Sequence, residues 1–145
     1  MQTIVLIVLV GLAGGIAIGL QSPLASMISQ RLGVLESVFI VHLGGALAAF
    51  VPLLIYGGGR IGGWRNVPWY TLGAGVFGLV VIGALSYMIP RVGIAVSITT
   101  LIAGQLLIGT ALDHFGLLGV VQRSFDFTRA IGLTVVFIGA WLTVR

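Results

Sequence analysis

The sequence predicts an all-α membrane protein with five transmembrane helices. Hydrophobic residues make up 59% of its 145 residues and charged residues only 7%, whereas a soluble domain is about 45–50% apolar and about 25% charged. Because so few charges cannot cover the surface of a soluble domain, lipid has to solvate most of the chain. Five apolar stretches approach the length that a bilayer requires, about 17–25 residues. They cover residues 3–29, 36–56, 67–89, 92–113 and 129–144.

Helix-breaking residues and arginines separate these stretches. Arg31 follows the first, and the glycine-rich segment 57–63 follows the second, where glycine makes helical order costly. Pro90 and Arg91 divide the third from the fourth, and residues 114–128 are expected to form a loop or interfacial stretch. The chain is therefore expected to form a single five-helix transmembrane domain over residues 1–145.

Composition also excludes several kinds of chemistry. The chain has no cysteine and no lysine, which excludes thiolate metal sites and Schiff-base catalysis. Its net charge of +4 comes from arginines scattered singly between apolar runs, and these form no basic stripe for nucleic acid. No phosphate-binding glycine loop, zinc-protease motif or serine-hydrolase motif is present. We therefore expect no enzyme, no cofactor, no metal and no nucleic-acid partner.

The distribution of arginine gives the chain almost no preferred orientation. With five spans, Arg60, Arg65, Arg123 and Arg129 fall on one side of the membrane, and Arg31, Arg91 and Arg145 fall on the other. Orientation follows the excess of cations in short loops, so four against three predicts insertion both ways and an antiparallel homodimer. A fixed orientation with a separate, oppositely inserted partner chain is the alternative. Transporters commonly pair two inverted repeats around a midplane site, and one five-helix unit would need a second copy to do so.

Polar residues within the spans are the candidates for binding a solute. Gln21 lies beside Pro23, and Gln105 lies near the middle of the fourth span. A glutamine in hydrocarbon has to find hydrogen-bond partners, so each either bonds to a neighbouring helix or contacts the solute. His42 lies within the second span, where it is either a packing residue or a site for substrate and protons. Tyr87 is either an interfacial anchor or a cavity residue.

Three further features have structural alternatives. Glu36 begins the second span, where an acid suits the helix dipole, but it could also couple transport to protons. Gly11, Gly15 and Gly19 repeat every four residues, which allows helices to pack closely in lipid. Asp113 ends the fourth span, where an acid opposes the helix dipole, so we expect it to pair with Arg123 or Arg129.

The stretch GQLLIGTALDHFGLLG, residues 104–119, resembles the signature of the YdcZ-like family of small membrane proteins in the drug/metabolite transporter superfamily. The Pro90–Gly93 segment and the surroundings of Gln21 also fit this resemblance. It implies one five-helix half of a ten-helix transporter, working as an antiparallel homodimer in the bacterial inner membrane. Residues matching the motif are Gln105, Asp113, His114 and Gly116. At position 42, by contrast, the family pattern leads us to expect a small polar residue where this chain has histidine.

Together these features predict a small-solute transporter, either an exporter or an exchanger, with a midplane site lined by Gln21, His42, Tyr87 and Gln105. A narrow ion channel with the same dual topology is a second interpretation. A third is a non-transporting membrane subunit, or one half of an obligate heterodimer. A stable complex with another protein and no flux from the chain alone would favour the third interpretation.

Overall fold

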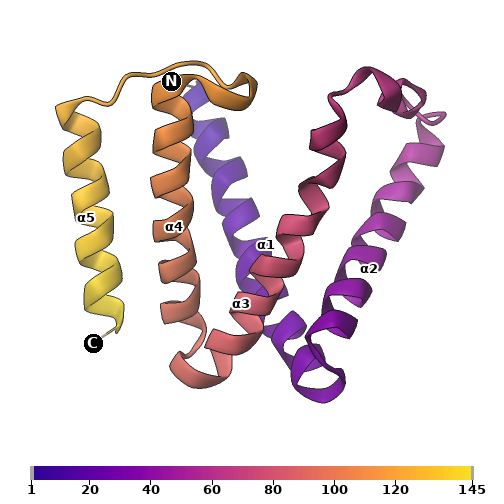
Figure 1. Cartoon of the computed structure of the whole chain (residues 1–145), viewed down its shortest axis with the longest axis horizontal. Helices are drawn as coiled ribbons and strands as arrows, with labels where there is room; N and C mark the ends of the chain where they lie inside the picture. Colours follow the sequence, from indigo (N-terminus) through magenta and orange to yellow (C-terminus); the bar gives the residue numbers. More distant parts are fainter. Residues whose placement is uncertain (1, 145) are drawn as a thin grey trace. The chain divides into compact units, whose positions relative to one another are not determined.

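The computed structural model describes residues 2–144, and every regular element among them is helical (Figure 1). The α-helices are α1 (Gln2–Leu32), α2 (Val34–Ile55), α3 (Val76–Val92), α4 (Ile94–Phe115) and α5 (Phe127–Val144). Three short 3-10 helices lie between them: η1 (Ile61–Asn66), η2 (Trp69–Gly75) and η3 (Leu117–Gly119). The all-α class predicted from composition is confirmed for this part of the chain.

Four helical segments are long and apolar enough to cross a membrane. They are Gln2–Leu32, Val34–Ile55, Trp69–Val92 and Ile94–Phe115, and they correspond to the first four predicted spans. The third segment differs in detail, because its first residues form the 3-10 helix η2 before α3 begins. The last apolar helix, Phe127–Thr143, is shorter than these four and is at the lower end of the length that a bilayer requires, about 17 residues. The fifth span therefore stays a prediction.

The helices form two compact units, residues 1–90 and 91–145, which we describe separately. In the first unit, α1 and α2 form a helical hairpin. Ser22, Ala25 and Ser26 are buried on α1, and the fully buried Ser37 of α2 donates its hydroxyl to the carbonyl of Ala25 at 2.7 Å. Small side chains let the two backbones approach closely, and the Ser37 hydrogen bond fixes one helix against the other.

A single glycine connects α1 to α2, and a single glycine connects α3 to α4. Gly33 (φ 120°, ψ 162°) separates α1 from α2, and Gly93 (φ 84°, ψ 170°) separates α3 from α4. This combination of positive φ and extended ψ is essentially restricted to glycine. At Gly33 a side chain would also collide with the carboxylate of Glu36. A one-residue connection between consecutive spans therefore depends on glycine at both positions.

In the second unit, α4 and α5 run side by side and are joined by η3 and an extended segment (Figure 1). An open apolar groove lies along them. Its lining residues are Leu107, Phe125, Ala130, Leu133, Thr134, Phe137, Ile138 and Trp141. Thr134, which lines this groove, satisfies its hydroxyl within its own helix by donating to the carbonyl of Ala130 at 2.8 Å.

Candidate functional site

His42 is held on α2 in a defined orientation. Its Nδ1 lies 2.8 Å from the carbonyl oxygen of Val38, one turn earlier. Because a carbonyl can only accept, Nδ1 must carry the proton, and in a neutral ring Nε2 is then an acceptor. Nε2 has no hydrogen-bond partner among the described residues. The structure therefore presents an imidazole with one nitrogen satisfied and the other available.

The available nitrogen of His42 lies against α3 at Gly78. A Cβ placed on Gly78 would collide with Nε2 and would come within 2.7 Å of Cε1. The absence of a side chain at Gly78 is therefore what leaves space for the imidazole between α2 and α3. Sequence reasoning singled out His42 but missed Gly78, because a lone glycine among many in these spans gives no signal of its own.

The two glutamines that were predicted to contact a solute are both exposed on the surface of this single chain. Gln21 lies on α1 in the first unit, and Gln105 lies on α4 in the second. Neither forms a hydrogen bond to another residue within the described part of the chain. The interhelical bond considered for each is thus not made within this chain, and both amides are free for a solute, water or a second protein. Tyr87 is also exposed.

Glu36 occupies the first turn of α2, as expected for an acid that favours the positive end of a helix dipole. Its carboxylate folds back over the backbone of Gly33. This places the negative charge beside the amide groups that begin the helix. A structural role at the helix start is therefore visible, while a role in proton coupling stays a prediction.

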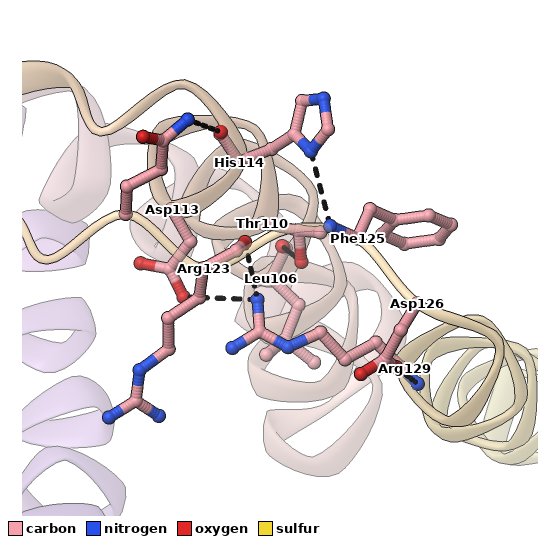
Figure 2. Close-up of polar contacts among 9 residues, drawn as sticks. Leu106, Thr110, Asp113, His114, Arg123, Phe125, Asp126 and Arg129 are labelled. Atoms are coloured by element: carbon pink, nitrogen blue, oxygen red, sulfur yellow. Dashed lines mark hydrogen bonds and ion pairs between the residues drawn. The ribbon is translucent and has the colours of Figure 1, made fainter.

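The Asp113 carboxylate joins the end of α4 to the start of α5 (Figure 2). Its Oδ2 lies 3.6 Å from Nη1 of Arg129, so the ion pair expected from the sequence is confirmed, with Arg129 as the partner. The backbone carbonyl of Asp113 also accepts from the amide of Arg123 at 2.8 Å. Two separate contacts of one residue thus hold the connecting segment in place.

His114 fixes the same segment through both its ring and its backbone (Figure 2). Its Nδ1 accepts a hydrogen bond from the backbone N–H of Phe125 at 3.1 Å, and its carbonyl accepts from Nε2 of Gln122 at 3.1 Å. Gly116 ends α4 in the left-handed conformation, with φ 60° and ψ 33°. A Cβ at Gly116 would come within 3.1 Å of the Gln122 side chain. Asp113, His114 and Gly116 of the motif therefore shape a loop, and Gln122 belongs to that loop although the sequence analysis did not name it.

The described residues contain no group of three or more histidine, aspartate or glutamate side chains that could hold a metal ion. The polar groups of the predicted solute site are two amides, one imidazole and one phenol, those of Gln21, Gln105, His42 and Tyr87. Such groups can bind and orient a solute.

An all-helical chain with four span-length apolar helices is a multi-pass membrane protein. It belongs to the family described as "Putative inner membrane exporter, YdcZ", which matches residues 6–142. It is 30% identical over 137 residues to the inner membrane protein YdcZ of Escherichia coli K12, covering 92% of this chain and 91% of that protein. No solved structure matches the chain. The family resemblance noted in the sequence is thus confirmed, and the protein is a multi-pass protein of the bacterial inner membrane.

Proposed function

We propose that the chain is a small-solute transporter, an exporter or exchanger, that works as an antiparallel dual-topology homodimer with a midplane site between the two copies. The observation that carries this proposal is the exposure of two unpartnered glutamine amides on apolar helices. Gln105 has eleven residues before it and ten after it in α4 (Ile94–Phe115), so it lies at the middle of that span. Because an amide in hydrocarbon without a partner is costly, both glutamines should face a second copy or a water-filled pathway.

The glycine repeat of α1 supports association with a second chain. A methyl group placed on Gly11, Gly15 or Gly19 would meet no neighbouring element within 4 Å. These small residues therefore have open space beside them within the described part of their own unit, although their spacing suits close helix–helix contact in lipid. A second copy facing the opposite way would pair two five-helix halves, as inverted repeats are paired in ten-helix transporters. The fifth span and the relation to a ten-helix transporter are part of this proposal.

Transport by this arrangement involves no enzymatic step. The solute would be bound by Gln21, His42, Tyr87 and Gln105. If transport is coupled to the movement of protons, His42 or Glu36 would carry the protons. Membership of an exporter family supports the direction of transport. Two antiparallel copies are the partners that the proposal requires, together with the lipid bilayer.

The dual topology can be tested with a single thiol, because the chain has no cysteine. Arg145→Cys would be labelled in intact cells with a membrane-impermeant maleimide and compared with permeabilised cells. About half of the molecules should be labelled from outside if the near-equal arginine count gives both orientations. If all or none are labelled, the homodimer proposal is wrong, and an oppositely oriented partner chain has to be sought.

A further inference from the structure

Ser86 of α3 is a buried hydroxyl without a hydrogen-bond partner. The residue is 7% exposed, and its Oγ is the single buried side-chain nitrogen or oxygen that lacks a partner in the part of the chain that the structure describes. Buried polar atoms in native proteins are almost always paired, so each exception calls for an explanation.

Seven hydroxyls in these helices are satisfied in the same way. Each donates to the carbonyl four residues earlier, at 2.6–2.9 Å, and the residues that do so are Ser22, Ser97, Thr99, Thr100, Thr110, Thr134 and Thr143. The same bond would be available to Ser86 through the carbonyl of Ile82, but it is not made. Ser86 therefore differs from these seven residues, because its buried hydroxyl has no partner.

The sequence around Ser86 resembles the sequence around Ser26, sixty residues earlier, where the serine hydroxyl has a hydrogen-bond partner. Between residues 26 and 44, identical residues occur at this spacing in five places, Ser26 and Ser86, Arg31 and Arg91, Gly33 and Gly93, Ser37 and Ser97, and Gly44 and Gly104. The backbone follows the same pattern, since both turn glycines combine a positive φ with extended ψ. Ser37 and Ser97 are both fully buried. The segments that contain α1 and α2 and those that contain α3 and α4 are thus internal sequence repeats.

Within this repeat, Ser26 has a partner and Ser86 does not. Nε2 of Gln30 donates to Oγ of Ser26 at 3.2 Å. The position equivalent to Gln30 is Pro90, whose side chain has no donor. The second repeat therefore keeps the buried serine and replaces the residue that would satisfy it.

Gly78, Ile82 and Ser86 follow one another at four-residue spacing on α3, and Ile82 is buried like Ser86. Gly78 is the residue against which Nε2 of His42 lies. Two polar atoms without partners, Oγ of Ser86 and Nε2 of His42, therefore border the same side of α3. Eight residues separate the two positions on that helix, which corresponds to about 12 Å along its axis.

Formal charges are absent from the interior of the spans. Each charged side chain within a described α-helix lies within two residues of a helix end, namely Arg31, Glu36, Arg91, Asp113 and Arg129. Asp113 is already paired with Arg129, and Asp126 accepts from the backbone amide of Arg129 at the start of α5. No arginine, aspartate or glutamate near the middle of a described helix would balance the charge of an ionised solute, and a second copy of the same sequence would add none.

We infer that the transported solutes are small uncharged molecules that carry both hydrogen-bond donors and acceptors, and that Ser86 contacts them. This inference rests on the proposed transport function. Nε2 of His42 accepts a hydrogen bond from a donor on the solute, and the hydroxyl of Ser86 pairs with a polar group at another point of the path. An unpaired buried hydroxyl is costly to the folded chain, and the solute satisfies it during transport.

The test of the solute class uses purified protein in liposomes that are loaded with a low-molecular-weight extract of bacterial cytosol. Mass spectrometry of the external medium identifies which compounds leave faster than from protein-free liposomes. We expect those compounds to have no ionised group at neutral pH. Export of ionised compounds would overturn the inference but leave transport standing, whereas the absence of any protein-dependent efflux would overturn the proposed function itself.

The role of Ser86 is tested on the compounds that leave fastest. Ser86→Ala should lower their efflux about tenfold, as expected for one lost hydrogen bond, while thermal stability in detergent stays the same or rises. Ser37→Ala is the matched control, because it removes a buried hydroxyl that does have a partner; it should lower stability. Ser86→Thr keeps a hydroxyl and should retain more efflux than Ser86→Ala. Unchanged efflux by Ser86→Ala, or a loss of stability equal to that of Ser37→Ala, would show that Ser86 is structural.

Discussion

Nη1 of Arg129 lies 3.6 Å from Oδ2 of Asp113, and the same nitrogen donates to the backbone carbonyl of Arg123 at 3.2 Å. One guanidinium group therefore holds the end of α4, the start of α5 and the segment between them (Figure 2). The two side chains of the pair are partly exposed, 28% for Arg129 and 40% for Asp113, which limits how much the charge pair alone can contribute.

Asp113→Asn should therefore cost less than about 1 kcal/mol of stability, and the loss should shrink as salt concentration rises. Arg129→Lys should cost a similar amount, because an ammonium group cannot reproduce the planar donors that reach both partners. Thermal unfolding in detergent at low and high salt measures both effects. Arg123→Lys is the control, since Arg123 takes part through its backbone; a loss there as large as in Arg129→Lys would contradict this assignment.

The loop after α4 should depend on an acceptor at the position of His114 Nδ1. In His114→Asn the amide oxygen can accept from the N–H of Phe125, whereas in His114→Ala it has no acceptor. Hydrogen exchange of the Phe125 amide should remain slow in the asparagine variant and become about five- to tenfold faster in the alanine variant, as expected for loss of one exposed hydrogen bond of about 1 kcal/mol. Equal exchange in both variants would mean that this bond does not hold the loop.

Sequence patterns predicted the helical spans well because they depend on local properties. Apolar stretches and helix-breaking residues placed the break between the first two spans at residues 29–36, and the structure has it at Gly33. The partner of Asp113 could be narrowed to two arginines because a helix C-terminus disfavours an acid. The choice of Arg129 over Arg123 depended on the path of the intervening loop, which has no periodic signal.

The candidate site was less predictable because its key features are contacts between distant residues. Nothing in the local sequence indicates that Gly78 lies against His42, or that Ser86 lacks a partner. The repeat with sixty-residue spacing was present in the sequence, in the shared pattern of Arg31, Gly33 and Ser37 with their later counterparts. A search for internal repeats would have shown Pro90 in the place of Gln30, and hence a serine without its donor.

The two turn glycines should respond unequally to substitution. Gly93→Ala should cost about 1–3 kcal/mol, because its backbone conformation is essentially restricted to glycine. Gly33→Ala should cost more, since a side chain there also collides with the carboxylate of Glu36. Adding Glu36→Ala should restore part of the stability lost in Gly33→Ala and none of that lost in Gly93→Ala. Thermal unfolding of the single and double variants decides this, and equal losses at the two glycines would refute the collision.

Gln21→Ala and Gln105→Ala should separate function from stability. Neither amide has a hydrogen-bond partner in the described chain, so each variant should unfold in detergent within about 0.5 kcal/mol of the parent, as surface substitutions do. Efflux from liposomes should fall about tenfold in each if both amides contact the solute. Gln30→Ala is the control, because it loses a hydrogen bond to Ser26 but lies at the end of α1; its efflux should be retained. Full efflux by both glutamine variants would remove them from the site.

The contact between His42 and Gly78 should appear as energetic coupling between α2 and α3. Gly78→Ala should destabilise the protein by about 1 kcal/mol, because the exposed imidazole must leave its position and lose its hydrogen bond to the carbonyl of Val38. His42→Ala removes the ring, so the same glycine substitution in that background should cost little or even stabilise the helix. Gly44→Ala on α2, where a methyl group meets no neighbouring element within 4 Å, should be nearly neutral in both backgrounds.

A double-mutant cycle measured by unfolding in detergent would give a coupling energy of about 1 kcal/mol or more. Additive effects of Gly78→Ala and His42→Ala would mean that the ring does not occupy this space, and His42 would then lose its place beside α3 in the proposed solute path.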